Sequence, residues 1–197
     1  MDAVRKTLVI ACGALARELV QVVAANRLTH LTITCLPAIW HNRPEKIPAG
    51  VRRKIRAARG KYDEILCLYG DCGTGGELDR VLAEEGVERI EGAHCYAFFA
   101  GVADFAAMME DEVGTFFLTD YLARHFDRLI IKGLGLDRFP QLRDDYFRHY
   151  TRLVYLAQVE DAALVVKARA AAERLGLAFE MRVTGYGAMA PFVARAA

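Results

Sequence analysis

The sequence predicts an α/β fold, a mostly parallel sheet with helices on both faces, built from βα units. Short apolar runs alternate with segments of helical periodicity along the chain, which is typical of such sheets. The composition, 54% hydrophobic and 26% charged over 197 residues, excludes disorder and provides for a full core. No linker rich in Pro or Ser interrupts the pattern, so residues 1–197 are expected to form one domain, with the weakest seam at 108–114.

The first half contains the clearest alternation. Leu15, Leu19, Val22 and Val23 have the spacing of one apolar helix face, and Gly86 is placed to end a helix in a left-handed cap. A glycine-rich turn covers 70–76, and the segment 37–48 is irregular. Strands are expected over 7–11, 31–34, 64–69 and 89–92, and helices around Leu15–Val23, over 51–59 and 77–85, and after Tyr96.

The second half continues the alternation with less regular spacing. The Ala-rich segment Ala162–Leu175 predicts a helix. Strands are expected over 116–118, 128–131, 153–156 and 179–183.

A weak internal repeat is visible in the first half. Cys12-Gly13 and Cys35 are separated by 23 positions, as are Cys72-Gly73 and Cys95. Each pair brackets a helix and a strand, so two βαβ units would give this pattern, although any two such units have similar lengths. The four cysteines are expected near strand ends, where ligands bind in open parallel sheets.

Charge and hydropathy exclude several classes of function. The formal net charge is +1, so nucleic acid is not expected as the main ligand. No apolar run approaches the ~20 residues of a membrane span. The apolar run 7–12 is short and is interpreted as a buried strand rather than a leader. We therefore expect a cytoplasmic protein with reduced thiols, for a small molecule or a protein partner.

The five cysteines carry the sharpest chemistry. Cys67 lies inside an apolar strand and is interpreted as a core residue. The other four can converge at one edge of the sheet, where thiolates would bind zinc or an iron–sulfur cluster and three ligands would leave an open position. The chain has no CxxC pair, so separate, uncoordinated thiols remain the alternative.

Polar residues near these cysteines are further candidates. The turn 70–76 lacks the lysine of a phosphate-binding P-loop; Asp71 is either an acid/base group or a turn residue. His41 would bind metal or move a proton, and Asn42, Arg43 and Lys46 would bind a carboxylate or phosphate; alternatively the segment is a solvated loop.

Three more residues complete the candidate site. His94 precedes Cys95 and is a second imidazole candidate, or simply a hydrogen-bonded residue. Lys132 and Tyr186 lie in glycine-punctuated segments expected at strand ends, which places them on the substrate side if one parallel sheet runs throughout.

Several motifs resemble a family of domains of unknown function found in methanogens and various bacteria. Some members of that family are encoded near corrinoid-dependent methyltransferases for methylated amines. The resemblance covers nearly the entire chain, implies a link to one-carbon metabolism and carries no assigned reaction. Its motif-like segments contain Cys12, Cys72 and Cys95, which makes these three the chosen ligands, with Cys35 a candidate fourth. The motifs are Ala11-Cys12-Gly13, His41-Asn42-Arg43-Pro44-Glu45-Lys46, Tyr69-Gly70-Asp71-Cys72-Gly73, His94-Cys95-Tyr96, Gly114-Thr115-Phe116-Phe117-Leu118-Thr119 and Lys132-Gly133-Leu134-Gly135-Leu136.

The leading hypothesis is a metal-dependent enzyme, a lyase or transferase. Cys12, Cys72 and Cys95 would hold a [4Fe–4S] cluster or zinc with one open position, acting on a small polar substrate. Two alternatives stay open. One is an accessory protein that binds a corrinoid, a metal or a methyltransferase component. The other is a transferase with Cys72 as nucleophile. Surplus apolar residues such as Phe98 and Phe99 are compatible with a homodimer or with ordinary burial.

Overall fold

The chain is organised as two compact units. The computed structural model describes residues 5–195. Unit 1 contains the residues up to Val102 and the segment from Tyr186 onward, and unit 2 is Ala103–Gly185. The first boundary falls shortly before the expected seam at 108–114. The return of the chain to unit 1 at Tyr186 leaves no signal in the composition, which is why the sequence predicts one domain.

Unit 1 is built on a parallel sheet with strand order β2-β1-β3-β4. β1 is central, and Ala11 pairs with Cys35 on one side and Leu68 on the other. The α/β class and the parallel strands are thus confirmed. The strands are β1 (Thr7–Cys12), β2 (Leu31–Leu36), β3 (Glu64–Leu68) and β4 (Glu88–Arg89).

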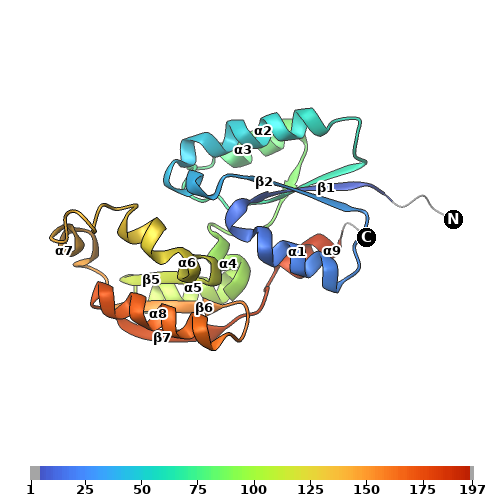
Figure 1. Ribbon diagram of the computed structural model, residues 1–197. Helices are drawn as coiled ribbons and strands as arrows, with labels where there is room; N and C mark the ends of the chain where they lie inside the picture. The colour runs from blue at the N-terminus through green and yellow to red at the C-terminus, as the bar shows by residue number, and fades with distance from the viewer. Residues whose placement is uncertain (1–4, 196–197) are drawn as a thin grey trace. The chain divides into compact units, whose positions relative to one another are not determined.

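Helices cover both faces of this sheet (Figure 1). Successive residues of a strand point to opposite faces, so Val9 packs into one apolar cluster and Ile10 into the other. The Val9 cluster includes residues of α1 (Ala16–Ala25), α4 (Cys95–Ala100) and α9 (Met189–Ala194). The Ile10 cluster includes residues of α2 (Ile47–Ala58) and α3 (Glu77–Glu85).

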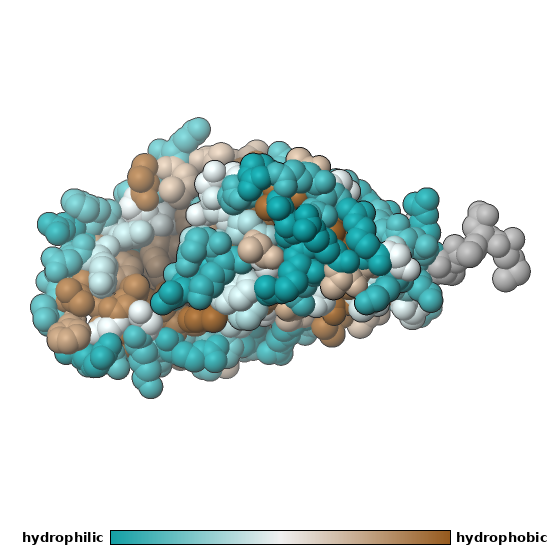
Figure 2. All heavy atoms as spheres, turned by 90° about the horizontal axis from the view of Figure 1, so that it is seen from above, coloured by the Kyte–Doolittle hydropathy of each residue, from teal (hydrophilic) through white to brown (hydrophobic). Residues whose placement is uncertain are grey.

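The outer surface of α2 and α3 is a solvated charged face. Arg52 pairs with Glu84, and Arg56 pairs with Glu85 at 2.8 Å. Seen from this side, the surface over the two helices is mainly hydrophilic (Figure 2). Exposed pairs of this kind contribute little to stability. These two ion pairs nevertheless neutralise the positive charges of Arg52 and Arg56 on α2.

The connection from β1 to β2 and the connection from β3 to β4 form two neighbouring βαβ units. Their helices, α1 and α3, lie on opposite faces of the sheet. The cysteines do not occupy equivalent positions in the two units. Cys12 and Cys35 lie within strands, whereas Cys72 and Cys95 lie beyond the ends of β3 and β4.

Unit 2 is built on a second parallel sheet with strand order β5-β6-β7. Leu118, Leu153 and Tyr155 form its core with the buried side of α8. On the other face of β5, the ring of Phe105 from α5 packs at a tilt against the ring of Phe117. The elements are β5 (Thr115–Thr119), β6 (Arg152–Ala157), β7 (Ala178–Val183), α5 (Val102–Asp111), α6 (Asp120–Phe126), α7 (Leu142–Phe147) and α8 (Ala162–Leu175).

The strand predicted over 128–131 is wrong. The segment Asp127–Ile131 is a π-helix, η4, which directly follows the C-terminal end of α6. The side chain of Thr119 caps the N-terminal end of α6. The backbone N–H of Lys132 donates to Asp127 O at 2.8 Å, one residue wider than an α-helical bond. The apolar run of this segment is interpreted as a buried strand. Ile131 is indeed buried in the core of unit 2, but a helical turn buries it as well as a strand would. The helices α6, α7 and α9 were also not predicted from the sequence.

Within the described residues, no helix combines the length and the apolar character needed to cross a membrane.

A substitution at Gly187 tests how the segment after Tyr186 is held in unit 1. A Cβ atom at Gly187 would lie 2.0 Å from the carbonyl oxygen of Phe98, and its φ is +48°. Gly185 has φ of +59° but no neighbour within 4 Å. We expect Gly185→Ala to lower the free energy of unfolding by about 1–2 kcal/mol through strain alone. Gly187→Ala should cost clearly more, measured by urea denaturation; equal losses would contradict the close approach.

Candidate functional site

The candidate site lies where the winding of the unit 1 sheet reverses. From the central pair β1 and β3, one βαβ unit proceeds outward to β2 and the other to β4. In such sheets the carboxyl ends of the two central strands leave a crevice in which ligands bind. Cys12 ends β1, and the turn containing Cys72 follows β3.

Cys12 is placed by a close approach of two backbones. A Cβ atom on Gly13 would lie 3.0 Å from the carbonyl oxygen of Leu36, so glycine lets the chain leave β1 beside the end of β2. The thiol is half-buried. Burial raises its pKa, although the nearby backbone N–H of Ala14 and the nearby hydroxyl of Tyr69 oppose the shift.

Cys72 is held against the loop that precedes α4. Its backbone N–H donates to Ala93 O at 2.8 Å, and its φ of +51° is unusual for a residue with a side chain. Burial and the charge of Cys12 raise its pKa to about 11. Hydrogen bonds from the backbone N–H groups of Gly70 and Cys95 to the sulfur act in the opposite direction.

Cys95 is the first residue of α4 and completes the group. Burial raises its pKa well above the ordinary value, and the charges of Cys72 and Cys12 add to the shift. The three cysteines selected as ligands, which come from three separate segments, therefore lie within electrostatic range of one another. Backbone N–H groups near each of the three sulfurs act to lower the thiol pKa, but burial outweighs them.

The side chains are not gathered around a single point. Among residues 5–195, no three His, Cys, Asp or Glu side chains form a group that could hold a metal ion. A tetrahedral zinc site with Zn–S bonds of about 2.3 Å would bring thiolates much closer together. In an iron–sulfur cluster each thiolate binds a different iron, so the ligands lie farther apart.

The two remaining cysteines differ from these three. Cys67 is fully buried in the core, and burial raises its pKa to about 12, in keeping with a structural role. Cys35 lies inside β2 rather than after it. Burial and the charge of Cys12 raise its pKa, while Lys54 lowers it, so Cys35 lies at the edge of the group.

Tyr69 is a site residue that the sequence analysis missed. Its side chain is 2% exposed, and apart from the contact with the Cys12 thiol its hydroxyl has no hydrogen-bond partner among the described residues. Burial and the neighbouring thiols Cys12, Cys67 and Cys72 raise its pKa. A tyrosine directly after a buried strand and before a glycine-rich turn is the signal that could have identified it.

The segment with His41 lies beside the cysteine-containing turn. It forms two short 3-10 helices, η2 (Ala38–Asn42) and η3 (Pro44–Lys46). A Cβ atom on Gly73 would lie 3.7 Å from Pro44. The pKa of His41 is lowered by loss of contact with water and by the charge of His94, so the two imidazoles are near each other.

Asn42, Arg43 and Lys46 extend from the same segment and are exposed. They supply hydrogen-bond donors and positive charge next to the imidazoles.

Asp71 is engaged in the turn itself. Its carboxylate accepts hydrogen bonds from Thr74 Oγ1 at 2.6 Å and from the backbone N–H of Gly76 at 2.8 Å. Partial burial would raise its pKa, but these bonds outweigh it and lower the pKa. The geometry is that of the turn residue considered from the sequence.

Lys132 and Tyr186 do not share one strand edge. Lys132 follows the π-helix in unit 2 rather than a strand, because the predicted strand is absent. Tyr186 belongs to unit 1, where its hydroxyl donates to Gln21 Oε1 of α1 at 2.7 Å. The premise that placed both on the substrate side, a single sheet, therefore fails.

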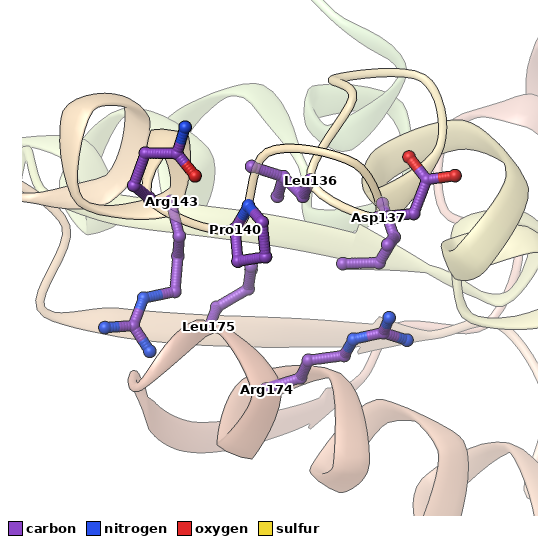
Figure 3. A pocket seen from close by; sticks show the side chains of 8 residues that line it. Leu136, Asp137, Pro140, Arg143, Arg174 and Leu175 are labelled. Carbon is purple, nitrogen blue, oxygen red and sulfur yellow. The ribbon is translucent and has the colours of Figure 1, made fainter.

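Unit 2 has a surface hollow of about 620 Å³ (Figure 3). Its lining includes the charged residues Arg143, Arg174 and Asp137 and the apolar residues Leu136 and Pro140. None of the described residues that line it is a cysteine or a histidine.

Comparison with known proteins gives a family without an assigned activity. Residues 35–193 match the family described as Protein of unknown function (DUF1638). No curated protein matches the chain. Among solved structures, ornithine carbamoyltransferase from Pyrococcus furiosus is similar at 16% identity with a TM-score of 0.30. That match covers 90% of this chain and 54% of the other, so this chain spans about half of its length.

The raised pKa of Cys72 predicts slow alkylation of the metal-free protein. With a pKa of about 11, only about 0.1% of this thiol is ionised at pH 8, against about a quarter of an ordinary thiol. Iodoacetamide should therefore modify Cys72 more than about tenfold more slowly than it modifies the urea-unfolded chain. The rate, followed by mass spectrometry, should rise up to about pH 11. A plateau below pH 8 would instead identify an activated nucleophile.

Proposed function

This chain belongs to the DUF1638 family, whose description assigns no activity, and we propose that it is a metal-dependent enzyme with a three-cysteine site in unit 1. The observation that carries the proposal is the convergence of Cys12, Cys72 and Cys95 at the reversal point of the sheet, within electrostatic range of one another. We propose a [4Fe–4S] cluster as the bound group, with zinc as the alternative.

The donor set and its surroundings suit such a group. Burial raises the pKa of all three half-buried thiols, and neighbouring thiols raise it further at Cys72 and Cys95. Such thiols are poor thiolates by themselves, but a bound cation would stabilise their ionised form. Backbone N–H bonds to the sulfurs, as at Cys72, are among the interactions that tune iron–sulfur clusters. In a cluster each thiolate binds a different iron, so a cluster does not require the three sulfurs to meet at one point, as a single zinc ion does.

The open position left by three protein ligands would supply a Lewis acid for a small polar substrate. His41 is the proposed proton-transfer group, because an imidazole can both accept and donate a proton near neutral pH. Asn42, Arg43 and Lys46 would bind a carboxylate or phosphate of the substrate. Asp71 is not proposed as an acid/base group, because its carboxylate already accepts hydrogen bonds from within the turn.

The observed thiols disfavour the nucleophile alternative, because a catalytic cysteine needs a lowered pKa and that of Cys72 is raised. An accessory protein for a corrinoid, a metal or a methyltransferase component remains the second candidate, supported by the resemblance to proteins encoded near methylamine methyltransferases. In that case the protein would bind those components stably and turn over no substrate, and a pull-down would detect the complex.

Metal analysis of single variants tests the proposal. Protein purified without oxygen should contain iron and acid-labile sulfide, or zinc, either as isolated or after reconstitution. Cys12→Ala, Cys72→Ala and Cys95→Ala should each lose most of the metal, because each removes a ligand.

Cys67→Ala is the matched control, because it removes a cysteine from the core of the same unit and should keep its metal. Circular dichroism would show that each variant is folded. A wild-type protein that takes up no metal after reconstitution, or equal metal loss in all four variants, would overturn the assignment.

A further inference from the structure

A second hollow in unit 2 lies between α6, the π-helix η4 and α8. Its volume is about 310 Å³. It contains none of the residues assigned to the cysteine site, so a ligand bound in it is independent of the metal proposed for unit 1. Its lining residues are Ala123, Arg124, His125, Phe126, Asp127, Arg128, Lys167, Ala170, Ala171 and Arg174.

Positive charge dominates this hollow. Its lining includes four cationic side chains and one carboxylate, Asp127, which pairs with Arg174. The charge of Arg124 is balanced by an ion pair with the buried carboxylate of Asp120, at 3.5 Å. Arg128 and Lys167 are exposed, and neither forms an ion pair with the described residues. At least two cations therefore face one opening without a counter-charge.

His125 lies close to several of these cations. Its ring lies against Tyr121, with the ring centroids 4.7 Å apart. Its pKa is lowered by loss of contact with water and then by the charges of Arg128, Arg124 and Lys167. These three cations, from α6, η4 and α8, act on one imidazole.

The backbone explains how neighbouring residues reach the same hollow. His125 has φ of −119° and ψ of 18°, which interrupts the helical geometry of α6 just before η4 begins. π-Helical turns are rare and often found at functional sites. Here the break and the π turn bring Arg124, His125 and Arg128 to one opening, opposite Lys167 of α8.

We propose that this hollow binds a dianionic oxyanion, specifically the phosphate group of a small molecule. Arg guanidinium groups donate paired hydrogen bonds to phosphate oxygens, and a lysine adds a point charge. The hollow is large enough for a phosphate with a small substituent, whereas its open shape and exposed cations suit moderate, salt-dependent binding.

The probes are inorganic phosphate and adenosine monophosphate, each added to the full chain at constant ionic strength with NaCl as reference. The signal is the NMR resonance of the His125 ring, identified by its disappearance in His125→Gln. Bound phosphate should shift this resonance and raise the pKa of His125, because a dianion favours the protonated ring. Tighter binding of the nucleotide than of phosphate would identify a phosphate ester as ligand; equal binding would identify phosphate itself.

Charge-removing variants locate the site. Arg128→Gln and Lys167→Gln should each weaken phosphate binding by about 2- to 5-fold, in line with single exposed charges. Arg53→Gln removes an equally exposed cation from α2 in unit 1 and should leave binding unchanged. The proposal is overturned if neither probe moves the His125 resonance beyond NaCl, or if Arg53→Gln weakens binding as much as the two hollow variants.

Discussion

The cost of ionising several thiols in one half-buried place governs the candidate site. Cys12, Cys72 and Cys95 each lose contact with water, and the charge of one disfavours the charge of the next. The site therefore has two favourable forms, three neutral thiols or three thiolates around a cation. The nearby hydroxyl of Tyr69 cannot resolve this conflict, because one neutral hydroxyl group cannot offset several charges. The raised pKa values favour protonated thiols when no cation is bound, and a bound cation is what would convert them into ligands.

The sheet topology makes this conflict unavoidable. Strands β1 and β3 are adjacent and parallel, so the residues after each strand are delivered to the same end of the sheet. Gly13 and Gly70 then allow close backbone approaches, the first toward Leu36 and the second toward the loop before α4. A side chain at Gly70 would meet the carbonyl oxygen of Gly92 at 2.9 Å. The glycines beside the cysteines are thus part of how the thiols are brought together, since bulkier residues would push these loops apart.

Local patterns predicted local structure well and long-range arrangement poorly. The helices Glu77–Glu85 and Ala162–Leu175 have the predicted bounds, because an apolar stripe and a left-handed glycine cap are encoded within each segment. The strand predicted within Asp127–Ile131 was wrong, because Ile131 can be buried equally well in a strand or in a π-helical turn. The meeting of Cys12 with Cys72 followed from the expected parallel sheet. The division into two units and the role of Tyr69 did not, because both depend on contacts between distant segments.

The net charge of the chain likewise says little about where individual charges lie in the folded protein. A total of +1 argues against a broad field that would attract nucleic acid. It does not describe how cations are distributed. Arg52 and Arg56 of α2 lie against glutamates of α3, whereas Arg128 and Lys167 form no ion pair with any residue between 5 and 195. A small dianion responds to the field within about one Debye length, roughly 8 Å at physiological salt, and is unaffected by the rest of the surface. A nearly neutral chain can therefore hold a strongly positive site, provided its acids lie elsewhere.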